Sequence, residues 1–228
     1  MRPIKLDVFA VIAVMLAMTS CEKNSSVDID EDLIQAVDLG LSVKWATCNV
    51  GASSPQDYGD YFAWGETVSK DNFIAETYKF IAGYDCLLTK YTDSICGYEG
   101  FEDLKTVLDS EDDAAYVNWG KEWRTPTKDE FQELIDSCTW EWITLNGIRG
   151  YKVSGKKPGF ENNSIFLPAQ GYMYDAYPYQ INYCACYWSS DLSDSSAYEA
   201  SYLYFHFNGK GFDTCYRYYG QSIRPVCE

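Results

Sequence analysis

Apolar residues recur at every second position near the start of the main body of the chain. The apolar side of this pattern consists of Val37, Leu39, Leu41, Val43 and Trp45. A period of two is typical of a half-buried strand, and Gly40 inside the pattern also allows a tight hairpin. A second short strand is predicted at 61–64, where Gly65 follows an aromatic run. Residues 66–109 are weakly patterned and predict loops with a partial helix.

Two helix starts follow in the middle of the chain. Ser110 precedes a run of acidic residues, which favours a short helix there because carboxylates stabilise a helix N-terminus. Thr127 and Glu130 have the spacing of a capping box, with a proline just before them. The apolar residues after this box, Phe131, Leu134 and Ile135, have the spacing of one buried helix face.

After residue 138 the pattern becomes almost wholly that of strands. Asn146-Gly147 separates two apolar runs, 140–145 and 148–153, and therefore predicts a hairpin. A second hairpin is predicted around Asn208-Gly209. Further strands are expected at 164–167, 187–189 and 222–226. Two short helices ahead of an antiparallel sheet indicate an α+β fold.

The first twenty residues are predicted to be an export signal. Arg2 and Lys5 precede an apolar run of eleven residues, 8–18. A helix of this length spans roughly 16 Å, which is shorter than the bilayer core of about 30 Å, so a secretory signal is favoured over a membrane span. The small residues before Cys21 resemble a bacterial lipoprotein cleavage site, which implies cleavage before Cys21 and acylation of that residue. The alternative is an ordinary secreted protein in which Cys21 is incidental.

Charge narrows the range of partners. The chain has 18 Lys and Arg against 34 Asp and Glu, a net charge of −16, so a phosphate backbone would be repelled and nucleic acid is an unexpected partner. Residues 21–33 predict an acidic flexible tether, and residues 34–228 predict one domain. The acidic run 28–32 lacks the glycine and distal glutamate of a calcium loop and is expected to be solvated. Acidic residues close behind a lipidated cysteine resemble the surface-export signals of some Gram-negative lipoproteins, which implies the exposed face of the outer membrane.

Several segments together resemble one known family. They are VDLGLSVKWATCNVGASSPQDYGDYFAWGE (37–66), DDAAYVNWGKEWRTPTKDEFQEL (112–134), NGIRGYKVSG (146–155), LPAQGY (167–172), YWSS (187–190) and GQSIRPV (220–226). This order resembles the Fibrobacter succinogenes major paralogous domain, found in exported and lipid-anchored proteins of Bacteroidetes-type bacteria. The resemblance implies a C-type-lectin-like fold, shared with formylglycine-generating enzymes, with two short helices packed on a twisted antiparallel sheet with long loops. It does not imply an activity, because one fold hosts many functions.

Eight cysteines remain after Cys21. They are Cys48, Cys86, Cys96, Cys138, Cys184, Cys186, Cys215 and Cys227. An even number in an exported chain is compatible with disulfides, although buried free thiols are an open alternative. Because the chain ends pair as neighbouring strands in lectin-like folds, the resemblance implies a Cys48–Cys227 disulfide. The other six cysteines cannot be paired from the sequence, and no two have the CxxC spacing of a redox or zinc motif.

Little in the sequence predicts catalysis, a metal or a cofactor. His206 is the single histidine, which removes most histidine-based acid–base and metal chemistry. The triplets Glu-Pro-Asn, Gln-Pro-Asp and Trp-Asn-Asp of calcium-dependent lectins do not occur. No motif maps the active-site cysteine pair of formylglycine-generating enzymes onto this chain, and an oxidase of that type is the remote alternative. We therefore expect a protein without enzymatic activity.

Tyrosine is the remaining unusual feature. Of the 20 tyrosines, 12 lie between residues 172 and 219. The stretch after LPAQGY resembles the long-loop region of the lectin-like fold, where ligands dock. The predicted ligand contacts are therefore Tyr172, Tyr174, Asp175, Tyr177, Tyr179 and Trp188. They predict a lipid-anchored envelope protein that recognises a cell-surface glycan or protein by aromatic contact. Two alternatives stay open: the tyrosines only cover a sheet, or the protein is a structural surface component without a small ligand.

Overall fold

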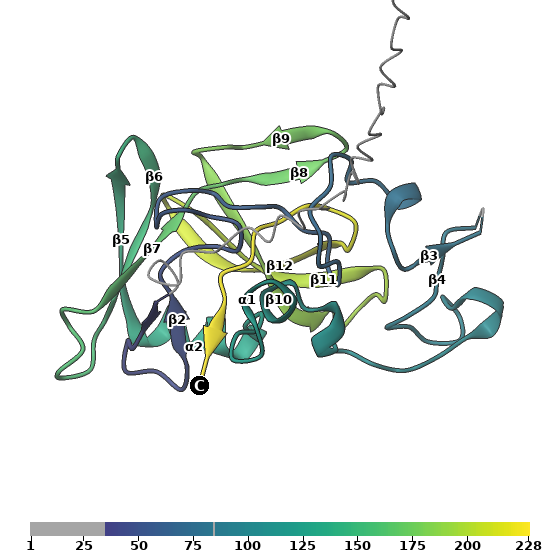
Figure 1. The fold of residues 1–228 in the computed structure, drawn as a ribbon, viewed down its shortest axis with the longest axis horizontal. Helices are drawn as coiled ribbons and strands as arrows, with labels where there is room; N and C mark the ends of the chain where they lie inside the picture. Colours follow the sequence, from purple (N-terminus) through teal and green to yellow (C-terminus); the bar gives the residue numbers. More distant parts are fainter. Residues whose placement is uncertain (1–34, 84) are drawn as a thin grey trace, which may run out of the picture.

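The computed structural model describes residues 35–83 and 85–228 of this chain (Figure 1). The predicted signal at 1–20, the predicted lipidation at Cys21 and the tether at 21–33 lie outside the described residues. The strands are β1 (Ala36–Val37), β2 (Lys44–Ala46), β3 (Ile81–Ala82), β4 (Leu87–Leu88), β5 (Cys138–Leu145), β6 (Ile148–Gly155), β7 (Ser164–Pro168), β8 (Tyr172–Tyr174), β9 (Tyr177–Tyr179), β10 (Cys184–Leu192), β11 (Glu199–His206), β12 (Gly209–Tyr216) and β13 (Val226–Cys227). The helices are η1 (Ala75–Thr77), η2 (Tyr98–Gly100), η3 (Ser110–Asp112), α1 (Ala114–Trp119) and α2 (Lys128–Ser137).

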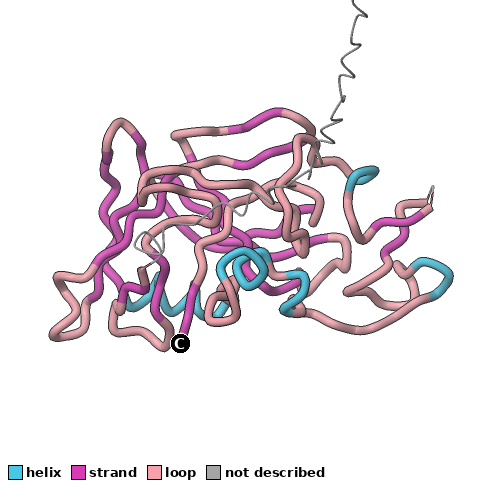
Figure 2. Tube along the Cα trace, viewed as in Figure 1, coloured by secondary structure: helices cyan, strands magenta, loops and turns pink. Residues whose placement is uncertain are grey.

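Antiparallel strands dominate the described residues, and the helices are few and short (Figure 2). Three-stranded sheets form from β10-β11-β12, from β5-β6-β7 and from β1-β2-β13, while β3-β4 and β8-β9 are two-stranded. The predicted α+β class is confirmed in this general sense. Both predicted hairpins are also confirmed: Leu145 pairs with Ile148 across the Asn146-Gly147 turn, and His206 pairs with Gly209 across a turn that Phe207 and Asn208 form, one residue before the predicted Asn208-Gly209.

The sheet β10-β11-β12 is covered on both faces. One face carries Tyr187, Leu203 and Phe205, which pack against α2 and the sheet β5-β6-β7. The other face carries Trp188 and Ala200, which pack against the aromatic side chains of residues 62–91. Burial on two faces explains why eight of the nine residues of β10 are buried and why its first five residues, 184–188, are apolar without alternation.

The helix starts are only partly as predicted. Thr127 and Glu130 form the expected capping box of α2, and Phe131 and Leu134 are buried. Ser110 instead begins the 3-10 turn η3, and Asp113 caps α1 by accepting hydrogen bonds from two backbone N–H groups. The prediction of a helix capped by Ser110 is therefore wrong by one turn. Asp113 also accepts hydrogen bonds from the backbone and hydroxyl of Thr125, which fixes α1 against the segment before α2.

The two ends of the described chain meet in the sheet β1-β2-β13. Of the two alternatives predicted for this stretch, a continuous strand and a tight hairpin, the chain forms a hairpin, with Val37 opposite Trp45, but residues 38–43 separate its strands, so the turn is not tight. Trp45 also pairs with Val226 of β13. The strand predicted at 61–64 is reduced to an isolated bridge between Phe62 and Gln221.

The Cys48–Cys227 disulfide implied by the resemblance is wrong. The chain ends are neighbours, but Cys227 lies opposite Lys44, four residues before Cys48. At about 3.3 Å per residue this offset is roughly 13 Å, beyond the Cα separation of about 7 Å that a disulfide can bridge. No disulfide is formed among the described residues.

Arg224 fastens the last segment of the chain to its surroundings. Its guanidinium is fully buried. It donates hydrogen bonds to the Asn49 side chain and to the backbone carbonyls of Ala46, Thr47 and Phe166. One side chain thus joins β2, the loop after it and β7.

Candidate functional site

The predicted ligand stretch folds as a hairpin and not as a long loop. Strands β8 and β9 pair Tyr172 with Tyr179 and Tyr174 with Tyr177 across a turn at Asp175-Ala176. Asp175 has a left-handed φ of 56°, a conformation that aspartate tolerates better than most residues. The hairpin lies along one edge of the molecule, beside the sheet β10-β11-β12 (Figure 1).

Two backbone ladders fix the hairpin in place. The backbone N–H and C=O groups of Met173 both bond to Gly220, at 2.7 and 2.9 Å. Those of Asp175 bond to Phe73, at 3.2 and 2.9 Å. The first ladder brings Tyr172 and Tyr174 next to Tyr219, although the two segments lie far apart in the sequence.

Six tyrosine rings form one continuous contact network. The rings of Tyr172 and Tyr179 stack with centroids 5.5 Å apart, and Tyr172 and Tyr219 stack 6.0 Å apart at an interplanar angle of 6°. Tyr174 contacts Tyr219 at 4.9 Å. We call the exposed patch that these rings form, together with the neighbouring Tyr177, the tyrosine surface. Its members are Tyr172, Tyr174, Tyr177, Tyr179, Tyr216, Tyr218 and Tyr219.

Exposure decides which of these tyrosines a ligand could reach. Tyr177 is 63% exposed and Tyr174 is 39% exposed. Tyr172 lies between two parallel rings, so it supports the surface more than it offers a free face. Trp188 is 1% exposed, and its indole N–H donates to the Phe62 carbonyl at 2.8 Å. The prediction that Trp188 contacts a ligand is therefore wrong.

The phenol groups at the base of the surface stay protonated over the physiological range. Burial raises the pKa of Tyr172 and of Tyr219 above the usual value. Burial also raises the pKa of Tyr218 to about 12, with Tyr219 adding to the effect. A protonated phenol both donates and accepts hydrogen bonds, so these groups can serve polar ligand groups without carrying charge.

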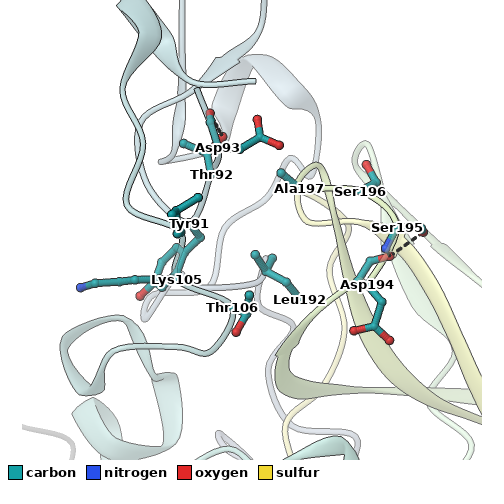
Figure 3. A pocket seen from close by; sticks show the side chains of 12 residues that line it. Tyr91, Thr92, Asp93, Lys105, Thr106, Leu192, Asp194, Ser195, Ser196 and Ala197 are labelled. Atoms are coloured by element: carbon teal, nitrogen blue, oxygen red, sulfur yellow. Dashed lines mark hydrogen bonds between the residues drawn. The ribbon is translucent and has the colours of Figure 1, made fainter. Parts of the chain in front are cut away.

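A separate polar cavity lies on another part of the molecule. It has a volume of about 260 Å³ and is lined by segments 91–93, 104–106 and 192–197. In Figure 3, Thr92 and Asp93 face Ser195 and Ser196 across this cavity. Part of its hydroxyl lining is already engaged, because the hydroxyls of Ser193 and Ser195 are hydrogen-bonded to each other at 2.9 Å. No sequence pattern predicts this cavity, because its walls come from three separate segments without a shared motif.

One cluster of carboxylates has the composition of a cation site but is already neutralised. Asp109, Glu111 and Asp112 bring their carboxylates together. The Lys90 ammonium lies 2.6, 2.9 and 2.6 Å from these three groups. Partial burial lowers the pKa of Lys90, but the hydrogen bonds to the three carboxylates outweigh it and hold the pKa above its usual value. A protein cation thus occupies the position that a metal ion would take.

The remaining candidate chemical groups within residues 35–83 and 85–228 are buried or bonded to the backbone. His206 lies at the end of β11, and its Nδ1 accepts a hydrogen bond from the Asn208 backbone at 3.1 Å. Cys184 and Cys186 are both buried on β10, on the same side as Trp188. The Ser189 hydroxyl donates to the Ser201 carbonyl and is fully buried. The tyrosine surface is therefore the exposed feature that best fits a binding role.

No family model, no curated protein and no solved structure matches this chain.

Proposed function

We propose that this protein is a lipid-anchored component of the bacterial cell envelope that recognises a glycan through its tyrosine surface and performs no chemical step. The observation that carries the proposal is the exposed aromatic network built from the β8–β9 hairpin and residues 216–219. Aromatic faces stack on the C–H surfaces of sugars, and the phenol groups hydrogen-bond to sugar hydroxyls.

The charge of the chain favours an uncharged glycan over an acidic one. The net charge is −16, and such a surface repels uronic acids and phosphates. A protein partner at the cell surface is the second possibility, because tyrosines are also enriched in adaptable protein interfaces. The binding experiment below distinguishes a protein partner from a glycan.

The lectin-like fold and the family resemblance are part of the same proposal. Two features support them: the sheet-rich architecture and the pairing of the chain ends through β2 and β13. The fold itself carries no activity, so the function is argued from the tyrosine surface.

Binding should depend on the most exposed tyrosines. Replacing Tyr177 or Tyr174 with alanine removes a stacking ring and is expected to weaken glycan binding at least tenfold, since about 1.4 kcal/mol corresponds to that factor. A glycan array followed by titration calorimetry measures the loss. Tyr98→Ala is the matched control because Tyr98 is also 39% exposed but lies on η2. Equal loss in Tyr98→Ala and Tyr174→Ala would contradict a localised site. A blank array combined with a crosslinked cell-surface protein would favour the protein partner.

The anchor is tested separately at the predicted lipidation residue. No helix within residues 35–83 or 85–228 has both the length and the apolarity to cross a bilayer. We therefore expect Cys21→Ala to abolish labelling by a radioactive fatty acid and to move the protein from the membrane fraction to the soluble fraction. Cys227→Ala serves as the control and should leave both properties unchanged. Labelling that persists in Cys21→Ala would refute lipidation at this position.

A further inference from the structure

Two of the cysteines lie on neighbouring backbone segments. Leu88 and Gly97 form a parallel bridge, and the Leu88 N–H donates to the Cys96 carbonyl at 2.8 Å. In a parallel register the preceding residues, Leu87 and Cys96, are then side by side. Cys86 precedes Leu87 by one residue, and consecutive Cα atoms are about 3.8 Å apart, so its Cα lies within about 9 Å of that of Cys96, and about 6 Å away if the step runs at right angles to the strand spacing of about 4.8 Å. A separation of about 6 Å is in the range of disulfides, about 4.4–6.8 Å.

The side chains of both cysteines approach the same tyrosine. Burial raises the pKa of the Cys96 thiol overall, while the Tyr198 hydroxyl acts to lower that pKa. Cys86 and Tyr198 line one cavity of about 230 Å³. Cys86 has a left-handed φ of 54°, so its side chain does not follow the alternation of a regular strand and is able to turn toward Cys96.

The five described cysteines that lie within strands have no cysteine opposite them in their sheets. Cys138 lies opposite Gly155, Cys184 opposite His206, Cys186 opposite Tyr204, Cys215 opposite Ala200 and Cys227 opposite Lys44. Cys184 and Cys186 are close along one strand, but both are buried and are therefore out of reach of a dissolved oxidant. Cys86 and Cys96 are both partly exposed.

We propose that Cys86 and Cys96 are a disulfide-forming pair that closes the loop 86–96 by exchange with a small-molecule disulfide. A thiolate of the pair attacks the oxidant, forms a mixed disulfide and releases one thiolate of the oxidant. The second cysteine, after losing its proton, attacks the protein sulfur of the mixed disulfide. This step forms the Cys86–Cys96 disulfide and releases the second thiolate of the oxidant. Two protein thiols are oxidised, and one disulfide of the oxidant is reduced to two thiols. In living bacteria the formation of this disulfide rests on the proposed export, because the compartments outside the cytoplasm are oxidising.

The disulfide would brace a part of the molecule that has little regular structure. Strands β3 and β4 and the turn η2 project from the end of the molecule in Figure 1. Ile95 and Leu104 in this region are largely exposed, and the region is held by short ladders. The same region supplies walls to the cavity at Tyr198 and to the polar cavity of Figure 3. A covalent link between Cys86 and Cys96 therefore fixes the shape of both.

Peptide mapping tests the pairing directly. Trypsin cuts after Lys79, Lys90 and Lys105, so Cys86 falls in peptide 80–90 and Cys96 in peptide 91–105. The purified full chain is equilibrated with oxidised and reduced glutathione, alkylated with N-ethylmaleimide and digested without reductant. We expect the two peptides to appear as one linked species that separates on reduction. Recovery of both peptides alkylated in excess oxidised glutathione, or linkage of either to another cysteine, would overturn the proposal.

Stability provides a second measurement on the same samples. Closing a loop of this size is expected to raise the melting temperature of the oxidised chain by roughly 5–10 °C over the reduced chain. Cys86→Ser should abolish this difference, whereas Cys227→Ser should keep it. A difference that survives in Cys86→Ser would assign the effect to another pair and count against the proposal.

A measurement in living cells distinguishes a failure of the cysteine pair from a failure of the proposed export. Cells that express the full chain are quenched with acid and N-ethylmaleimide before lysis. If the link forms with glutathione in solution but is missing in cells, the chemistry of the pair stands and the export to an oxidising compartment fails. If the link is missing in both, the pair itself is refuted.

Discussion

Replacing Arg224 with methionine is expected to lower the free energy of unfolding by about 3–5 kcal/mol. The guanidinium is fully buried and donates hydrogen bonds to Asn49, Ala46, Thr47 and Phe166. Methionine fills part of the volume but leaves these acceptors without a donor in an environment that water does not reach, which costs about 1–3 kcal/mol for each unsatisfied group. Urea denaturation followed by tryptophan fluorescence measures the loss.

Arg149→Met is the control for the loss of a positive charge. Arg149 is exposed on β6, so its replacement should change the free energy of unfolding by less than about 0.5 kcal/mol. If Arg224→Met unfolds at the same urea concentration as the unmodified chain, the role of Arg224 in fastening the chain ends is wrong.

The second large effect is expected for Gly171→Ala, at the entrance to the β8–β9 hairpin. Gly171 has a φ of 68°, and an added Cβ would overlap the Tyr179 carbonyl oxygen and come within 3.0 Å of the Gln180 carbonyl carbon. Both obstacles are backbone atoms of the same hairpin, so β9 must move away from β8. We expect a loss of about 2–4 kcal/mol in the free energy of unfolding, from left-handed strain and overpacking together. Because the tyrosine surface is built on this hairpin, glycan binding should fall more than tenfold.

Gly147→Ala separates the two contributions in Gly171→Ala. Gly147 also has a left-handed φ, of 87°, but an added Cβ there meets nothing within 4 Å. Its replacement should cost only the conformational strain, about 1–2 kcal/mol, and leave glycan binding unchanged. Equal effects of the two substitutions on stability and binding would show that the contact with β9 is unimportant.

Local signals predicted much of the secondary structure. The Asn146-Gly147 dipeptide located the β5–β6 hairpin because its two-residue turn requires left-handed φ values, and both residues adopt them. Asn208-Gly209 marked the β11–β12 hairpin only approximately, since the turn there is formed by Phe207 and Asn208. The capping box of Thr127 and Glu130 located α2 because both halves of that motif lie within one helical turn. The helix start predicted at Ser110 was wrong because Asp113 follows three residues later and its carboxylate accepts the hydrogen bonds that cap α1.

Long-range pairing limited what the sequence could predict of the site. Tyr172, Tyr174, Tyr177 and Tyr179 were found because they are close in the chain. Tyr216, Tyr218 and Tyr219 join them only through the ladder between Met173 and Gly220, which no local pattern encodes. The high density of tyrosines between 172 and 219 was the available signal. Trp188 was misplaced because alternation along a strand shows which side chains share a face, but not which face another segment covers.

The pairing of β1 with β2 has a mechanical consequence for a molecule held at its amino end. A pull on residue 35 acts first on β1, which is joined to β2 by the pairs Ala36–Ala46 and Val37–Trp45. This ladder has only two pairs, and the first fully buried side chain after it is that of Leu39, which is expected to resist further opening. Tension that opens this ladder would release residues 35–38 and add roughly 13 Å of extended chain between the point of attachment and the rest of the domain. The β8–β9 hairpin is not part of this ladder, so opening the ladder under tension would leave the pairing of Tyr172 with Tyr179 and of Tyr174 with Tyr177 in place.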